Sequence, residues 1–234
     1  EVCAEVAKIL SDIGLMPALV TSYEQGLRWK DAPIGKELTR IVEEKGVKIV
    51  TWVWQAGGIA SRGKPILQPD DVKGLKFRGG SKEMDTMLKA AGASPTNVPS
   101  SEIYNAMQSG VLDAALTSST SLISFLLHVH AKHVTTARDK TFWFMFEPIM
   151  MSKASFDKLT PEQQKIVLEV GAGLEKFGME AARADDQKLA SVYTQAGDAV
   201  HDMNEAAFAQ WRDIARTSAW KDFEERIPNG QKLL

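Results

Sequence analysis

An arginine followed by two glycines is the arrangement in this sequence with the most evident chemistry. Arg78 ends a short strand-like run, and Gly79 and Gly80 follow it directly. A guanidinium group presents a planar fork of N–H donors that binds a carboxylate through two parallel hydrogen bonds. Glycine has no Cβ, so a ligand can approach its backbone closely. These three residues therefore predict a carboxylate site, with an ordinary surface charge as the alternative for the arginine.

A run of hydroxyl side chains, TSSTS at 117–121, supplies a second possible contact surface. Hydroxyls can donate hydrogen bonds to a carboxylate, and a helix that begins just beyond them would favour the same negative charge. Thr117 and Ser118 are therefore candidates for the ligand, while N-capping of that helix is an alternative that can hold at the same time. Ser100 has the same two interpretations, of which capping is favoured.

Two tryptophans and one acid lie in strongly apolar runs. Trp54 and Trp143 each alternate with their neighbours along a predicted strand, so each either faces a cleft or packs into the core. Glu147 is the lone acid within 141–151. A buried carboxylate needs a partner, because unpaired burial is unfavourable and raises its pKa. We expect Glu147 to accept a ligand hydroxyl, to pair with a cation or to help hold a metal.

Motifs for catalysis and for metal binding are missing from the sequence. There is no GxSxG, Walker loop, HExxH or dinucleotide fingerprint. Of the clustered histidines His128, His130 and His133, only the last two would share a helix face, and no acidic third ligand accompanies them. The single cysteine, Cys3, permits no internal disulfide. We therefore expect no catalytic residue, no cofactor and no metal.

Composition restricts the class of protein further. The chain has 234 residues, of which 44% are hydrophobic and 25% charged, values typical of soluble globular proteins. The net charge of −2 supplies no positive field for a polyanion, so nucleic acid is not an expected partner. The longest apolar stretch, 122–129, is far below the roughly 18 residues of a membrane span. The first ten residues lack the basic region of a signal peptide, and we expect the chain to begin inside a longer precursor.

The elements that must position these residues alternate between strand and helix. β-Branched and aromatic residues predict a strand at 47–54, which the segment AGG at 56–58 should end. This alternation continues along the chain and predicts an α/β fold. Further strands are expected at 75–78, 94–98, 111–116, 141–151 and 199–201, and helices at 35–45, 81–90, 100–109, 117–133 and twice near the end of the chain.

A very long helix is predicted in the second half of the chain. Residues 160–163 form a capping box with Pro161 at the first helical position, and apolar residues recur at helical spacing as far as Tyr193. Unbroken, this helix would have roughly 35 residues and a length of about 50 Å. Such a helix should brace two lobes, unless the three glycines in its middle kink it into two ordinary helices.

Three segments in order carry a family resemblance: PILQPDDVKGLKFRGG from residue 65, AAGASPTNVPSSEIYNAMQSGVLDAALTSS from residue 90, and FDKLTPEQQKIV from residue 156. They resemble the periplasmic solute-binding proteins of tripartite ATP-independent periplasmic (TRAP) transporters, of the C4-dicarboxylate-binding (DctP) type. The resemblance implies a two-lobed α/β fold of the periplasmic-binding-protein kind, with a long helix spanning both lobes. It also implies that the first lobe lacks its N-terminal strands in this sequence.

The resemblance assigns parts of the chain to the two lobes. Lobe I is expected from 1–55 and 146–185, and lobe II from 56–145 and 186–234. The long helix, at about 161–196, is expected to span both.

A function follows from the same resemblance. In that family an arginine at the position of Arg78 clamps the ligand carboxylate, and a polar residue at the position of Thr117 assists it, although segment 114–118 departs from the family's usual Gln-Glu-Asn-Pro run. Ser100 stands where relatives often place an aromatic residue against the ligand. The expected protein is a periplasmic monomer that captures a small organic acid by hinge closure and delivers it to the membrane permease of a TRAP transporter. A binding protein that serves a sensor, an α/β enzyme acting on small carboxylates and a purely structural domain are the alternatives.

Overall fold

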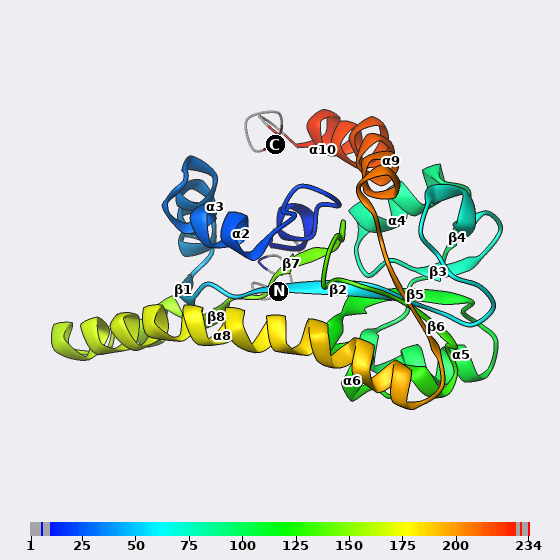
Figure 1. The fold of residues 1–234 in the computed structure, drawn as a ribbon. Helices are drawn as coiled ribbons and strands as arrows, with labels where there is room; N and C mark the ends of the chain where they lie inside the picture. The colour runs from blue at the N-terminus through cyan, green and yellow to red at the C-terminus, as the bar shows by residue number, and fades with distance from the viewer. Residues whose placement is uncertain (1–5, 7–9, 228–229, 231–233) are drawn as a thin grey trace.

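The computed structural model describes residues 6, 10–227, 230 and 234, so Cys3 lies outside the described residues. Strands and helices alternate along the described part, which confirms the expected α/β class. Two long elements run through it, strand β2 (Trp54–Ser61) and helix α8 (Pro161–Gln195). Figure 1 shows α8 passing beneath β2 and reaching both ends of the molecule.

Within the described residues, seven strands form one mixed sheet in the order β4-β3-β5-β2-β6-β9, with β7 paired to the first half of β2. Strands β3, β4 and β5 are parallel, so their carboxyl ends lie at the same edge of the sheet. Strand β2 runs antiparallel to both β5 and β6. The bounds are β3 (Lys76–Arg78), β4 (Ser94–Pro95), β5 (Ala114–Ser118), β6 (His133–Thr136), β7 (Phe144–Phe146) and β9 (Ala199–Asp202).

A second, smaller sheet lies at the other end of the molecule (Figure 1). It consists of β1 (Val47–Thr51) and β8 (Ile149–Ser152), which pair antiparallel. Helices α2 (Tyr23–Arg28) and α3 (Pro33–Glu44) cover this end on the side opposite α8. Strand β2 and helix α8 therefore connect two groups of elements.

Helix α8 is continuous over 35 residues, as the sequence predicts. Thr160 accepts a hydrogen bond from the backbone N–H of Gln163 and the Gln163 side chain accepts one from the Thr160 N–H, which completes the capping box. Gly171 faces the small sheet, where an added Cβ would lie 2.2 Å from the carbonyl oxygen of Val50. Gly171, one of the three glycines that could have kinked the helix, therefore permits close packing of α8 on β1.

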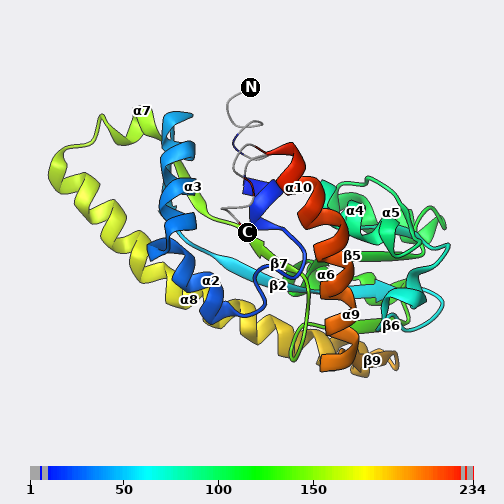
Figure 2. The ribbon, with the colours of Figure 1, turned by 90° about the horizontal axis from the view of Figure 1, so that it is seen from above.

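The remaining helices cover the large sheet and close the chain. Figure 2 shows α9 and α10 crossing in front of the sheet, between α3 and the α4–α5 region. The α-helices are α4 (Lys82–Ala90), α5 (Ile103–Gln108), α6 (Ser119–Ser124), α7 (Lys153–Phe156), α9 (Glu205–Ala215) and α10 (Lys221–Arg226). Short 3₁₀ turns are η1 (Trp29–Asp31), η2 (Pro69–Val72), η3 (Ser100–Glu102) and η4 (Leu127–Val129).

A π-helical segment, η5 (Arg216–Trp220), joins α9 to α10. Its last residue, Trp220, donates its indole N–H to the carbonyl oxygen of Pro17 at 2.9 Å. Arg226 binds Asp12 at 3.0 Å and Glu83 at 2.8 Å. The last helix is thus attached both to the start of the described chain and to α4.

The expectation that the segment AGG at 56–58 ends a strand is wrong. The strand from residue 47 ends at Thr51, and β2 then runs straight through Gly57 and Gly58. An added Cβ would lie 2.3 Å from the carbonyl oxygen of Thr117 at Gly57 and 2.4 Å from that of Thr135 at Gly58. These glycines therefore permit close approach of neighbouring strands, which is the other established use of glycine in a strand.

The helix predicted over 117–133 is also wrong in extent. Helix α6 ends at Ser124, and Leu126 adopts a left-handed conformation with φ of 54° before the turn η4. His133 lies in β6 rather than on a helix, so it shares no helix face with His130. Strand β5 begins three residues later than expected, at Ala114, and the run 141–151 divides into β7 and β8.

Candidate functional site

Arg78 lies at the carboxyl end of β3 and is half-buried. Its Nη1 donates to the carbonyl oxygen of Leu116 at 2.8 Å, and its Nε donates to that of Val98 at 3.1 Å. In the described part of the chain no hydrogen bond engages its Nη2. Two backbone carbonyls therefore fix the plane of the guanidinium group, and N–H donors remain for a ligand.

The turn after Arg78 requires its glycines. Gly80 has φ of 93°, in the left-handed region, and an added Cβ there would lie 2.7 Å from Nη1 of Arg78. The backbone N–H of Gly79 donates to Oδ1 of Asp85 at 3.2 Å. The chain thus folds directly over the guanidinium group, and α4 holds this turn in place.

The electrostatics of this edge favour an incoming anion. Burial lowers the pKa of Arg78, an effect that the nearby Asp85 carboxylate opposes. Because a partly desolvated cation without a contacting anion is unfavourable, a carboxylate that binds it recovers electrostatic energy. Helix α4 begins beside the arginine, where Ser81 accepts a hydrogen bond from the N–H of Met84 and caps the positive end of the helix dipole.

Thr117 and Ser118 end β5 next to Arg78, whose Nη1 binds the preceding carbonyl. Both are 4% exposed. Ser118 accepts from the N–H of Ser121 at 3.2 Å, so it caps α6, as one of its two interpretations proposed. No hydrogen bond among the described residues engages the Thr117 hydroxyl, which therefore remains free to donate.

Trp143 belongs to the same neighbourhood. Gly57 pairs with Ser118 across the sheet and accommodates the Trp143 ring, whose Cε3 would lie 2.4 Å from an added Cβ. Trp143 is 2% exposed, and its Nε1 is a buried donor with no partner in the described structure. A buried indole N–H without an acceptor is unusual. It supports a ligand role for Trp143, which stays a prediction.

Two of the other candidates lie away from Arg78. Trp54 is 3% exposed and packs against Trp29 and Phe146, with ring centroids 5.0 and 5.2 Å apart. These contacts fit the core-packing alternative, but the Nε1 of Trp54 is, like that of Trp143, a buried donor with no partner in the described structure, so a ligand contact for Trp54 stays a prediction. Glu147 follows Phe146, which pairs with Trp54 at the start of β2, three residues before Gly57. Burial raises the pKa of Glu147.

Ser100 occupies the first position of η3, two residues beyond the carbonyl of Val98 that holds Arg78. The N-cap of that turn is Pro99, so Ser100 does not have the favoured capping role. Its side chain is partly exposed near the site. A ligand contact for Ser100 stays a prediction.

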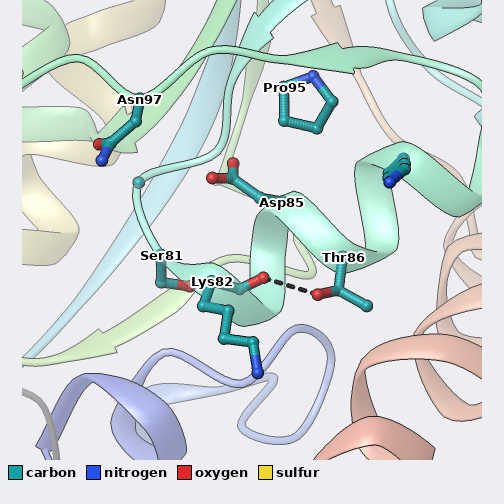
Figure 3. Close-up of a pocket in the computed structure, with 8 residues that line it drawn as sticks. Ser81, Lys82, Asp85, Thr86, Pro95 and Asn97 are labelled. Carbon is teal, nitrogen blue, oxygen red and sulfur yellow. Dashed lines mark hydrogen bonds between the residues drawn. The ribbon is translucent and has the colours of Figure 1, made fainter.

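A cavity of about 590 Å³ opens beside the Gly79–Gly80 turn (Figure 3). In Figure 3 the Asp85 carboxylate projects between the turn and the segment after β4 that carries Asn97. Asp85 and Asn97 were not predicted from the sequence. Asp85 lies about one helical turn after the cap Ser81, and in the fold its side chain reaches back to the N–H of Gly79. The cavity is lined by Gly80, Ser81, Lys82, Asp85, Thr86, Lys89, Pro95 and Asn97.

Neither a metal cluster nor a membrane helix is found in the described ranges. No group of three or more His, Cys, Asp or Glu side chains there could hold a metal ion. His133 instead stacks on His201 of the adjacent strand, with ring nitrogens 3.4 Å apart. None of the described helices combines the length and the apolar character that crossing a membrane requires.

A model of the family described as bacterial extracellular solute-binding protein, family 7 (DctP) matches residues 4–226. The chain belongs to this family. A relative from Albidiferax ferrireducens, named solute-binding protein, is 55% identical over 223 residues, which are 95% of this chain and 66% of the relative. The chain thus spans about two thirds of the length of the curated relatives it matches.

Solved structures confirm the two-lobed α/β fold with its long helix. A TRAP periplasmic solute-binding protein from Rhodoferax ferrireducens, with bound malonate, is 54% identical and superposes with a TM-score of 0.94 over 98% of this chain and 72% of that one. The Bordetella pertussis extracytoplasmic solute receptor DctP7, which binds pyroglutamic acid, is 25% identical, with a TM-score of 0.83 over 97% of this chain and 76% of the receptor.

Proposed function

We propose that this family 7 chain captures a small organic acid as the solute-binding component of a TRAP transporter, with Arg78 as the carboxylate clamp. The observation that carries the proposal is the fixed guanidinium group at the shared carboxyl edge of β3 and β5, with Nη2 unengaged among the described residues. The carboxyl edge of parallel strands is a recurrent ligand site in α/β folds. Malonate and pyroglutamic acid, bound by the two relatives, both present a carboxylate.

The proposed mechanism is capture by closure. The ligand carboxylate accepts hydrogen bonds from Arg78, and the Thr117 hydroxyl and the Trp143 indole N–H supply further donors. Closure removes water from these contacts, which strengthens them because the local dielectric constant falls. A ligand shifts the open–closed equilibrium only through its higher affinity for the closed form.

We infer the place of action and the partner from the family resemblance. The closed protein delivers the acid to the membrane permease of the transporter, in the periplasm, and acts as a monomer. The named periplasmic relatives support the compartment. Family members and structural neighbours are solute receptors, and no feature of the site favours an enzyme or a sensor component over a transport receptor.

The test is the substitution Arg78→Lys, followed by calorimetry with malonate and with pyroglutamate. A lysine offers a point charge and cannot reproduce the paired hydrogen bonds or the two carbonyl contacts, so affinity should fall at least about tenfold, or roughly 1.4 kcal/mol. The control is Arg62→Lys, an exposed arginine beyond the far end of β2. A loss below threefold at Arg78 would exclude it as the clamp.

A further inference from the structure

The side chain of Tyr23 contacts three separate segments of the chain. Tyr23 begins α2 and is 6% exposed. Its hydroxyl donates to Oδ2 of Asp186 at 2.7 Å and accepts from the backbone N–H of Ala56 at 3.2 Å. Its ring packs edge-on against Phe144, with centroids 5.2 Å apart. One residue therefore joins β2, β7 and α8.

These contacts fall where the chain is expected to pass between the lobes. The expected boundaries are 55/56, 145/146 and 185/186. Ala56 and Asp186 are each the first residue after a boundary. Phe144 pairs directly with Ala56 in the sheet and lies two residues before Phe146, the first residue after the remaining boundary. All crossing segments thus meet around one tyrosine.

Asp186 extends the contact to the carboxylate site. It is 3% exposed, and its Oδ1 accepts from the Ser119 hydroxyl at 2.5 Å. Ser119 begins α6, immediately after Ser118. Ala56 in turn precedes Gly57, which packs against Trp143 and the Thr117 carbonyl. The network therefore lies directly behind the residues proposed to bind the ligand.

We propose that Tyr23 and Asp186 form the hinge junction of this protein, positioning residues that set the free-energy difference between the open and closed forms. The inference rests on the proposed function. Both oxygens of the Asp186 carboxylate are buried and engaged, and a motion that separated them from Tyr23 or Ser119 would leave a buried acceptor unpaired. Closure is therefore restricted to rotations that keep these bonds, and the junction acts on ligand affinity without touching the ligand.

The decisive variant is Tyr23→Phe, which keeps the ring on Phe144 but removes the hydroxyl that links Ala56 to Asp186. Spin labels at Lys36→Cys in α3 and Gln108→Cys in α5, in a Cys3→Ser background, report the distance between the two ends of the molecule. We expect a broader distance distribution without ligand and at least a fivefold change in the dissociation constant for malonate. The preference between malonate and pyroglutamate should stay the same.

Two controls separate the hinge role from general stability. Asp185→Asn weakens an exposed hydrogen bond from the Thr120 hydroxyl to Asp185, which is 2.6 Å long and joins α6 to α8, as the Ser119–Asp186 bond does. The distance distribution and the dissociation constant for malonate should both stay within twofold of the parent. Ile59→Val destabilises the core of β2 and should lower the melting temperature without broadening the distance distribution.

The outcome that overturns the inference is a Tyr23→Phe protein that loses stability but keeps the distance distribution and affinity of the parent. Failure of the proposed function is distinguishable from this. In that case the parent and Tyr23→Phe would bind neither acid, while the ligand-free distance distributions would still show whether the hydroxyl holds the hinge.

Discussion

Glu83 is a buried acid whose ion pair does not fully compensate for its burial. It is 1% exposed and binds Arg226 at 2.8 Å, but Arg226 is shared with Asp12 and Asp222. One of its oxygens, Oε2, has no partner in the described structure. Burial, reinforced by the charge of Asp12, raises the pKa of Glu83 to about 7 despite the ion pair. The carboxyl group is therefore partly protonated at neutral pH.

This shift predicts a pH-dependent stability. The folded pKa lies above the unfolded value of 4.5, so the folded state binds more protons between these values, and stability falls as the pH rises from about 4.5 to about 7. The contribution amounts to about 3 kcal/mol at most. Glu83→Gln should remove this part of the slope in urea unfolding measured from pH 4.5 to 8. An unchanged slope would show that Glu83 ionises normally.

At the level of single residues, sequence patterns predict a role where few chemical uses fit a side chain. Arg78 and its two glycines are predicted as a carboxylate site from their types, and this role stays a prediction. Asp85 and Asn97 could not be predicted, because many acids and amides in the chain have the same local context. Only the fold shows that Asp85 turns back to the N–H of Gly79.

The long helix contains two glycines that should respond oppositely to the same change. At Gly171 an added Cβ would lie 2.2 Å from the Val50 carbonyl oxygen, so Gly171→Ala must push α8 off β1 and should destabilise the protein by about 1–3 kcal/mol. At Gly173 an added Cβ meets nothing within 4 Å, so Gly173→Ala should stabilise it by up to about 1 kcal/mol. Thermal unfolding of both variants checks the prediction, which equal effects would refute.

Elements were predictable where local signals agree with one another. The capping box, the proline at the first position and the apolar spacing together predict α8 correctly from its first residue. Glycines are ambiguous, because they end some elements and permit close packing in others. Gly57 and Gly58 permit close packing because β5 and β6 lie on either side of β2. This arrangement belongs to the tertiary structure and cannot be recognised in the local sequence.

The coupling between the two groups of elements should depend on an unbroken α8 where the helix passes from one group to the other. Ala182 is 6% exposed, one turn before Asp186. Ala182→Pro should cost roughly 3 kcal/mol as an interior helix break and should also loosen the relation between the lobes. Malonate affinity should therefore fall although Ala182 lies on α8 rather than at the carboxylate site, and small-angle scattering should show incomplete compaction with ligand.

The matched control is Gly173→Pro, in the part of α8 that reaches the small sheet alone. It should lower stability to a similar degree and leave affinity per folded molecule unchanged. If Ala182→Pro stays folded, binds normally and compacts fully, the helix does not brace the lobes.

The π-helical segment η5 has a consequence for how such a molecule can change over evolutionary time. A π turn contains one residue more than an α turn, which is the geometry that a single-residue insertion into a regular helix produces. An insertion that was not absorbed would rotate every later residue by about 100° around the helix axis. The wide turn takes up the extra residue, so Trp220, which closes η5, and Arg226, beyond it, keep the side from which they reach Pro17, Asp12 and Glu83. A residue lost from α9 itself would have no such turn to absorb it and would turn both side chains away from these partners.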